Sequence, residues 1–263
     1  MSANAHTQPA SAAWSQQVEL VFALIERDQR LLYARSLLGA LWAVAQPLML
    51  VGFYAVLMGG ILRPGVERQG LFVLAGLLPW LWFSGAVTAS AGAFPGNAPL
   101  LRQNAFPAEL LIVSAVGSHF VTFLLALALL LPLVGSGANS LATLAFLPLL
   151  FAIQAAFTVG IGLAVGTGNA LWRDVGHIVG VLLRGWFIAT PVLYLSSRLP
   201  ADLHGWMWLN PMAGLVEAYQ SVLCWGQPPQ ASVLLGTSAF AAATLLLGLA
   251  AFSLGRHRIP EEV

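Results

Sequence analysis

The chain has 263 residues, a mean hydropathy of +0.82 and only 8% charged residues. A soluble domain carries about 25% charged residues, so this composition excludes a soluble protein and indicates an integral membrane protein. The net charge is +1, and the single cysteine, Cys224, excludes an intrachain disulfide and suits a packing role.

All eleven basic residues are arginines, and the chain contains no lysine. A P-loop needs a lysine to reach the β- and γ-phosphates of ATP, and a Schiff-base enzyme needs one as well. We therefore expect no ATP hydrolysis by the P-loop route in this chain alone. We also expect no cofactor, no metal and no nucleic-acid partner.

The N-terminal region contains two predicted segments. Residues 1–15 lack the basic start and apolar core of a signal peptide and predict a disordered cytoplasmic tail. Residues 16–35 predict an amphipathic helix, in which Glu26 precedes Arg30 by four residues. The apolar residues at helical spacing are Val18, Val21, Phe22, Ile25 and Leu32. Such a helix suits the membrane interface, and the alternative is a cytoplasmic helix packed on a partner protein.

Residues 36–255 predict an all-α membrane domain with six spans, followed by a cytoplasmic tail over 256–263. A span needs about 20 apolar residues. The six stretches that meet this length are 37–62, 70–92, 108–133, 141–168, 176–196 and 231–254. Prolines in or near these stretches do not exclude helices, because neighbouring helices can satisfy the carbonyls that a proline releases.

The distribution of arginines predicts that both termini are cytoplasmic. Cytoplasmic segments attract arginine and lysine. With the N-terminus inside, the cytoplasmic arginines are Arg27, Arg30, Arg35, Arg102, Arg173, Arg256 and Arg258. The outside arginines are Arg63, Arg68 and Arg198.

Residues 93–109 form the longest predicted cytoplasmic loop. Pro99 can begin a short helix and Pro107 can end it. We expect Leu100, Leu101 and Arg102 to lie along that helix, with an apolar ridge facing water that would need a partner. The alternative is a helix on the membrane surface.

The second inner loop, 169–174, contains Arg173 and Asp174. A positive-inside anchor followed by an acid at a helix start accounts for both residues. A contact with a partner protein is the alternative.

Arg184 lies inside the fifth predicted span. From Asp174 to Arg184 is about 15 Å of helix, near the midplane of a bilayer core of about 30 Å. An arginine that faces lipid at that depth costs about 2.5–3.5 kcal/mol, so we expect Arg184 to face protein or water. The residues predicted to share its helix face are His177, Val181, Ile188 and Pro191.

Aromatic residues gather near the predicted outer halves of the spans. Tyr54, Trp186, Phe187 and Tyr194 are candidates to line a path between the helices. A membrane-interface belt is the alternative. His119 follows Ser118 in the third span, where a helix–helix hydrogen bond is favoured over an intramembrane protease. Ion-coupled transport is disfavoured because the spans contain almost no carboxylates.

Residues 197–230 are too interrupted to span a membrane and too apolar for a solvated loop. The interruptions are Asp202, His204, Asn210-Pro211, Glu217 and Pro228-Pro229. They predict two short re-entrant helices between spans five and six, with Asn210-Pro211 as the turn. An ordinary structured loop is the alternative.

Four motifs occur in an order that resembles one transporter family. The first consists of Leu38-Gly39-Ala40-Leu41-Trp42 with Gln46-Pro47. The others lie at 104–111, 172–194 and 209–219. Together they resemble type-2 ABC transporter permeases of the polysaccharide exporters, which serve O-antigen, teichoic-acid and capsule chains. The resemblance covers about residues 20–255.

The resemblance implies a half-transporter in the bacterial cytoplasmic (inner) membrane. Two permease chains would form one channel, and two separate ATPase chains would carry ATP and Mg²⁺. The substrate would be a lipid-linked polysaccharide, and His177 and Arg184 would face the channel. The path for the sugars would be lined by aromatic residues, because an aromatic face suits the C–H face of a pyranose. The candidates are Tyr54, Trp186, Phe187 and Tyr194. The loop containing Leu100, Leu101, Arg102, Gln103 and Asn104 would be the coupling helix in a groove of the ATPase, with Arg173 and Asp174 as a possible second contact. The rivals are export of a drug or small lipid, a non-transporting membrane anchor, and last an intramembrane enzyme.

Overall fold

The computed structural model describes residues 10–33, 39–42, 45–46, 48–50, 52–53, 69–102, 106–134, 141–196, 205, 207 and 209–262. Within these residues every regular element is helical, which confirms the predicted all-α class. The longer helices are α1 (Ala10–Tyr33), α3 (Gln69–Ala93), α5 (Glu109–Val134), α7 (Leu147–Leu171), α8 (Asp174–Ala189) and α11 (Ala231–Gly255). The shorter ones are η1 (Gly39–Leu41), η2 (Pro95–Asn97), α4 (Ala98–Leu101), α6 (Leu141–Leu144), α10 (Pro211–Gln220), η4 (Ser221–Trp225) and α12 (Ile259–Glu262).

Four of the described helices are long and apolar enough to cross a membrane. They cover Gly70–Ala93, Glu109–Pro132, Ala142–Leu171 and Ala231–Gly255. Their positions agree with the second, third, fourth and sixth predicted spans, and the chain is a multi-pass membrane protein. The first predicted span, 37–62, lies largely outside the described residues, so the count of six remains a prediction.

Helix α8 is shorter than the predicted fifth span, 176–196, because it ends at Ala189. The physical reason is Pro191, since a proline disfavours helical backbone in the residue before it. Thr190 is accordingly extended, with φ −100° and ψ 133°. The 16 residues of α8 form a rod of about 24 Å, shorter than a bilayer core of about 30 Å. The prediction that this span continues to residue 196 is therefore wrong.

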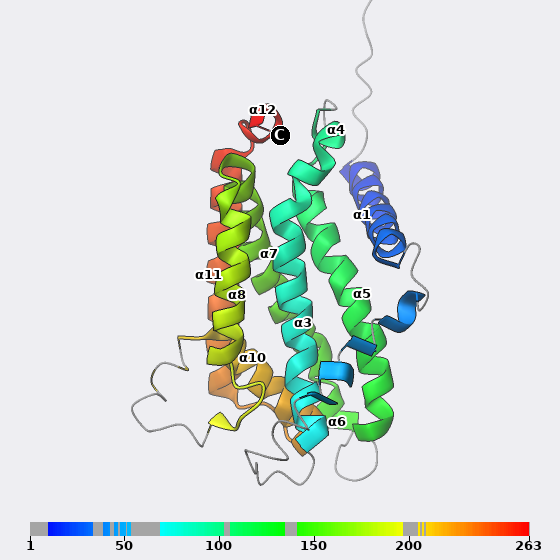
Figure 1. Ribbon diagram of the computed structural model, residues 1–263, viewed down its shortest axis with the longest axis vertical. Helices are drawn as coiled ribbons and strands as arrows, with labels where there is room; N and C mark the ends of the chain where they lie inside the picture. The colour runs from blue at the N-terminus through cyan, green and yellow to red at the C-terminus, as the bar shows by residue number, and fades with distance from the viewer. Residues whose placement is uncertain are drawn as a thin grey trace, which may run out of the picture.

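The helices α3, α5, α7, α8 and α11 run side by side along the molecule (Figure 1). The short helices α4 and α12 lie at one end, here named the α4 end. The helices α6 and α10 lie at the opposite end, the α10 end (Figure 1). Because successive long helices alternate in direction, the loop between α3 and α5 and the loop between α7 and α8 both lie at the α4 end.

Helix α1 is the predicted amphipathic helix, and it packs along α5 (Figure 1). It begins at Ala10, within the segment predicted to be a disordered tail, because alanines at positions 10, 12 and 13 favour helix. Leu24 is buried, and Gln29 Nε2 donates a 2.9 Å hydrogen bond to Ser118 Oγ of α5. Val18 and Phe22, four residues apart on one face of α1, remain exposed and form a second apolar surface that suits a membrane interface.

Helices α7 and α11 form the most extensive helix–helix contact among the described elements. They approach most closely where Gly160 lies against Gly248. A methyl group added at Gly160 would lie 2.5 Å from the carbonyl of Thr244, and one added at Gly248 would overlap the backbone of Gly160. Small residues at such crossings allow the backbones of membrane helices to pack directly against each other.

Uncharged amide side chains join helices through backbone carbonyls. Gln154 Nε2 on α7 donates a 2.8 Å hydrogen bond to the Pro79 carbonyl of α3. Asn169 Nδ2 donates a 2.7 Å hydrogen bond to another carbonyl of α3. Gln220 Nε2 on α10 donates a 3.2 Å hydrogen bond to the Pro191 carbonyl that follows α8. Polar contacts of this kind hold membrane helices together without burying charge.

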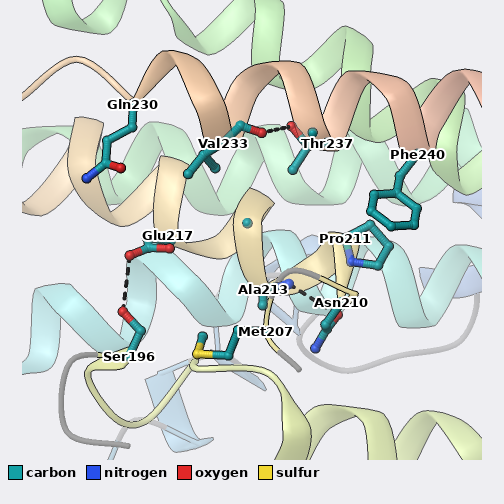
Figure 2. Close-up of a pocket in the computed structure, with 12 residues that line it drawn as sticks. Ser196, Met207, Asn210, Pro211, Ala213, Glu217, Gln230, Val233, Thr237 and Phe240 are labelled. Atoms are coloured by element: carbon teal, nitrogen blue, oxygen red, sulfur yellow. Dashed lines mark hydrogen bonds between the residues drawn. The ribbon is translucent and has the colours of Figure 1, made fainter. Parts of the chain in front are cut away.

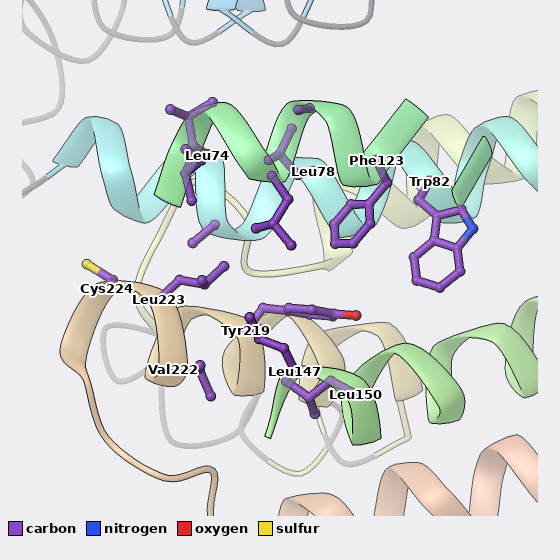
Figure 3. Close-up of a cluster of buried hydrophobic side chains, with 14 of the residues drawn as sticks. Leu74, Leu78, Trp82, Phe123, Leu147, Leu150, Tyr219, Val222, Leu223 and Cys224 are labelled. Carbon is purple, nitrogen blue, oxygen red and sulfur yellow. The ribbon is translucent and has the colours of Figure 1, made fainter. Parts of the chain in front are cut away.

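An apolar core fills the α10 end, where α10 and the π-helical turn η4 pack against α3, α5 and α7 (Figure 3). Tyr219 lies at its centre and is fully buried. The labelled neighbours in Figure 3 are Leu74, Leu78, Trp82, Phe123, Leu147, Leu150, Val222, Leu223 and Cys224. The helix predicted after Asn210-Pro211 is present as α10, and Cys224 has the predicted packing role. A re-entrant position in the membrane remains a prediction.

A second apolar core lies at the α4 end and joins segments from across the chain. Its members include Leu24, Phe94, Leu101, Ile112, Leu163, Phe252 and Ile259. Ile259 of α12 is fully buried against α7. Part of the segment predicted as a simple C-terminal tail is therefore packed into the body of the protein.

Candidate functional site

One face of α8 is exposed and carries two basic side chains. His177 and Arg184 are both exposed, and they lie two turns apart on the same face, as their spacing predicts. The apolar side chains exposed around them are Ile178, Val181, Leu182 and Ile188, each more than half exposed. Pro191, predicted to continue this face, lies beyond the end of the helix and is buried. The prediction that Pro191 shares the face is therefore wrong.

Trp186 and Phe187 lie instead on the side of α8 that packs against α3 and α7. The ring of Trp186 meets those of Trp80, Phe83 and Phe157 with centroid separations of 6.5, 5.2 and 6.3 Å, each edge to face. The ring of Phe187 lies 5.5 Å from that of Trp80. This packing accounts for both side chains, and the structure does not bring them to the surface that carries Arg184.

Tyr194 follows the end of α8 and is partly buried. Its Oη donates a 3.2 Å hydrogen bond to the carbonyl of Ile188. That hydrogen bond holds the Tyr194 hydroxyl against the last turn of α8, beside the exposed face. Tyr54, the remaining candidate for a sugar path, lies outside the described residues.

Asn210 joins the end of α8 to the start of α10. Its Oδ1 accepts the indole N–H of Trp186 at 2.8 Å and the backbone N–H groups of Met212 and Ala213 at 3.1 and 3.2 Å. Its Nδ2 donates to the carbonyl of Ala189 at 3.2 Å. The sequence indicated a turn at this position, and the N-cap bonds are local to it. The link to α8 was not predictable in the same way, because its partners lie more than 20 residues away in the chain.

The loop between α3 and α5 contains the predicted short helix, which begins with η2 and ends at Arg102. Leu101 is buried in the core of the α4 end, and Leu100 packs against the same core. The predicted apolar ridge facing water is therefore wrong, because these leucines face the interior of the protein. The exposed residues of the loop are Pro95, Gly96, Pro99 and Arg102. Gln103 and Asn104 lie outside the described residues.

The loop between α7 and α8 presents three consecutive exposed residues. They are Trp172, which is 68% exposed, Arg173 and Asp174. Asp174 is the first residue of α8, the position at which an acid stabilises a helix. Sequence reasoning did not single out Trp172. The sequence feature that could have indicated an exposed Trp172 is its position at the end of an apolar span, next to Arg173.

A polar cavity of about 410 Å³ lies between α1, α3 and α5, and sequence reasoning did not find it. Arg27 pairs with Asp28 at 2.8 Å, and its Nη1 donates a 2.8 Å hydrogen bond to Asn97 Oδ1 of η2. His119 also lines the cavity, and its ring packs so closely on Gly85 that a methyl group there would lie 2.6 Å from Nδ1. Helix α1 is thus bonded to the loop that carries α4.

The charges of the described helices limit the chemistry of the site. Between the ends of α3, α5, α7, α8 and α11, Arg184 is the one formally charged side chain that the structure describes. An exposed guanidinium can bind an anion through charge-assisted hydrogen bonds. The described residues contain no group of three or more His, Cys, Asp or Glu side chains that could hold a metal.

Comparisons with known proteins place these features in a family. Residues 19–224 match the family described as ABC-2 type transporter. The chain is 32% identical over 248 residues to the O-antigen export system permease protein RfbA of Myxococcus xanthus, across 93% of this chain and 95% of that protein. It is 28% identical over 207 residues to a protein of the same name from Klebsiella pneumoniae, across 78% and 80% of the two chains. It is 23% identical over 250 residues to the polysialic acid transport protein KpsM of Escherichia coli, across 92% and 96%.

Proposed function

Because the chain belongs to the ABC-2 type transporter family, we propose that it is the transmembrane permease subunit of a polysaccharide exporter. Its substrate is a lipid-linked polysaccharide of the O-antigen, capsule or teichoic-acid type, which it carries across the bacterial cytoplasmic membrane. The observation that carries this proposal is the similarity to an O-antigen export permease along 93% of the chain.

In this proposal both termini and the α4 end face the cytoplasm. The excess of arginines in the corresponding segments supports that orientation. A separate ATPase, present in two copies with ATP and Mg²⁺, contacts the α4 end. Its contact surface on the permease consists of the exposed part of the loop containing Arg102 and the exposed residues Trp172, Arg173 and Asp174.

The exposed face of α8 supports a homodimer with the transport path between its two chains. Arg184 lies about 15 Å along α8 from Asp174, and an arginine facing lipid at such depth costs about 2.5–3.5 kcal/mol. Its exposed apolar neighbours need a dry surface, whereas its guanidinium needs water or an anion. A second permease chain packed against this face covers the apolar side chains, and the path between the two chains holds the water or the anion. Arg184 and His177 then lie beside the path, with Tyr194 at its border. The guanidinium then stabilises the phosphates of the lipid carrier as they pass.

The proposed function is tested by deleting the gene in its source strain and restoring it from a plasmid. We expect the deletion to abolish surface polysaccharide and to accumulate lipid-linked polysaccharide inside the cell, and the plasmid to reverse both effects. Unchanged surface polysaccharide in the deletion strain contradicts the proposal. If surface polysaccharide is unchanged but drug sensitivity is raised or the lipid distribution is altered, the result favours export of a drug or a small lipid.

The role of Arg184 is tested by Arg184→Gln, with Arg184→Lys as the charge-retaining variant. Glutamine can still donate to a carbonyl but cannot attract a phosphate by charge. Because hydrogen bonds to charged groups contribute about 1.5–3 kcal/mol, we expect export to fall by at least about tenfold in Arg184→Gln and less in Arg184→Lys. Val181→Gln, on the same face, controls for the added amide. Wild-type export in Arg184→Gln contradicts a role in the path.

A further inference from the structure

A pocket between α10 and α11 lies close to the end of α8, at the α10 end of the molecule (Figure 2). In Figure 2 one wall is α11, which carries Val233 and Phe240, with Gln230 immediately before its first residue. Ser196 and Met207, from the segment that follows α8, lie on the opposite side (Figure 2). Glu217 of α10 lies between the two walls. The pocket therefore combines polar side chains with apolar and aromatic ones.

The Glu217 carboxylate supplies the strongest hydrogen-bond acceptor in the pocket. Ser196 Oγ donates a 3.1 Å hydrogen bond to Glu217 Oε1. Within the part of the chain that the structure describes, this is the one hydrogen bond of a carboxylate whose two oxygens can accept about four. Glu217 is half-buried, so additional hydroxyl donors would meet it partly shielded from water.

Gln230 supplies both a donor and an acceptor at the same end of the pocket as Glu217 (Figure 2). It is the residue before α11, and its side chain does not cap the helix. Among the described residues its amide has no hydrogen-bonding partner, and it is exposed. A carboxylate beside a free amide suits a ligand with neighbouring hydroxyl groups, which both donate and accept.

The opposite end of the pocket carries an aromatic ring, with Asn210 and Thr237 nearby. The ring of Phe240 lies beside Pro211 there (Figure 2). The cavity volume is about 240 Å³. Pockets for drug-sized ligands measure about 300–1,000 Å³ and combine apolar walls with a few polar groups. This pocket therefore has room for one sugar ring rather than for an oligosaccharide.

The charge of the pocket decides between sugar and phosphate. Glu217 is acidic, which disfavours a phosphate or pyrophosphate beside it. A neutral pyranose at the Glu217 end has hydroxyls for Glu217 and Gln230. We propose that this pocket binds a neutral sugar unit of the exported glycan as it leaves the transport path. This inference rests on the proposed function and assigns the glycan a contact separate from Arg184.

The proposal is tested by placing a photoreactive amino acid at position 230 in exporting cells. We expect irradiation to yield a permease adduct that carries the strain's own glycan, detected by an antibody against that glycan. The matched control is position 235, because Leu235 lies on the same helix and is 73% exposed. A glycan adduct that is as abundant at position 235 as at position 230 overturns the proposal. So does a position-230 adduct that carries phospholipid without glycan, since an amine headgroup would also pair with Glu217.

Two substitutions separate ligand binding from folding. Glu217→Gln keeps an acceptor for Ser196 but removes the charge, and we expect the glycan adduct at position 230 to fall by about tenfold. Ser196→Ala removes the internal hydrogen bond and leaves the carboxylate, and we expect the adduct to persist. Equal loss in both variants indicates a structural role and overturns the proposal. If the deletion strain fails to export but Glu217→Gln exports and forms the adduct normally, the proposed function stands and this inference fails.

Discussion

The crossing of α7 and α11 allows a sharp test of how the helices are held together. In Gly248→Ala, the new methyl group would overlap the backbone of Gly160, which cannot rotate away as a flexible side chain can. Overpacking costs about 1–3 kcal/mol, and we take the upper value because the obstacle is backbone. Alanine regains about 1 kcal/mol of helix propensity. The expected net loss is about 2 kcal/mol, or about a 30-fold shift in the folding equilibrium.

The matched control is Gly236→Ala, because Gly236 lies on the same helix and a methyl group there meets no atom within 4 Å. We expect that variant to be unchanged or more stable by about 1 kcal/mol. The assay is equilibrium unfolding of the purified permease in mixed micelles, followed by tryptophan fluorescence. Wild-type stability of Gly248→Ala, or an equal loss in Gly236→Ala, would refute the reasoning.

Two further predictions concern the ends of α4 and α8. Arg102→Glu should reduce export by at least about tenfold, because reversing an exposed charge weakens docking of the ATPase. Membrane insertion of the variant is measured as the control and should be unchanged. Normal export by the inserted variant contradicts a coupling role. Asn210→Ala should lower the free energy of unfolding by about 2–3 kcal/mol, because it removes the N-cap of α10 and leaves the partly buried Trp186 N–H without its acceptor. Asn210→Asp keeps that acceptor and should lose less, and equal losses in the same unfolding assay would contradict this account.

The membrane helices were the most predictable part of the fold. The stretch predicted over 108–133 is α5, Glu109–Val134, and the stretch predicted over 231–254 is α11, Ala231–Gly255. This agreement has a physical reason, because the length and hydropathy of a span are properties of one continuous segment. The exposed face shared by His177 and Arg184 follows equally from helical periodicity within α8.

Features that depend on several segments were not predictable in the same way. The end of α8 at Ala189 depends partly on Pro191. It also depends on two amide side chains from a later segment: Asn210, the N-cap of α10, donates to the Ala189 carbonyl, and Gln220 of α10 donates to the Pro191 carbonyl. Leu101 looked like part of a ridge for a partner, but the core it enters is built from helices distant in the sequence. The polar cavity beside Asp28 likewise combines three helices, so no single motif indicated it.

The amide bonds between the helices have an electrical consequence. The side chains of Gln154, Asn169 and Gln220 carry no charge and do not titrate, so a voltage across the membrane exerts no net force on these three amide groups. Away from the ends of α3, α5, α7, α8 and α11, Arg184 is the one formally charged side chain that the structure describes, and the voltage acts on it. Moving one charge through the full potential changes the free energy by about 2.3 kcal/mol per 100 mV. Within these five helices, away from their ends, a membrane potential therefore acts through Arg184 of α8 and exerts no net force on the amide groups that join the helices.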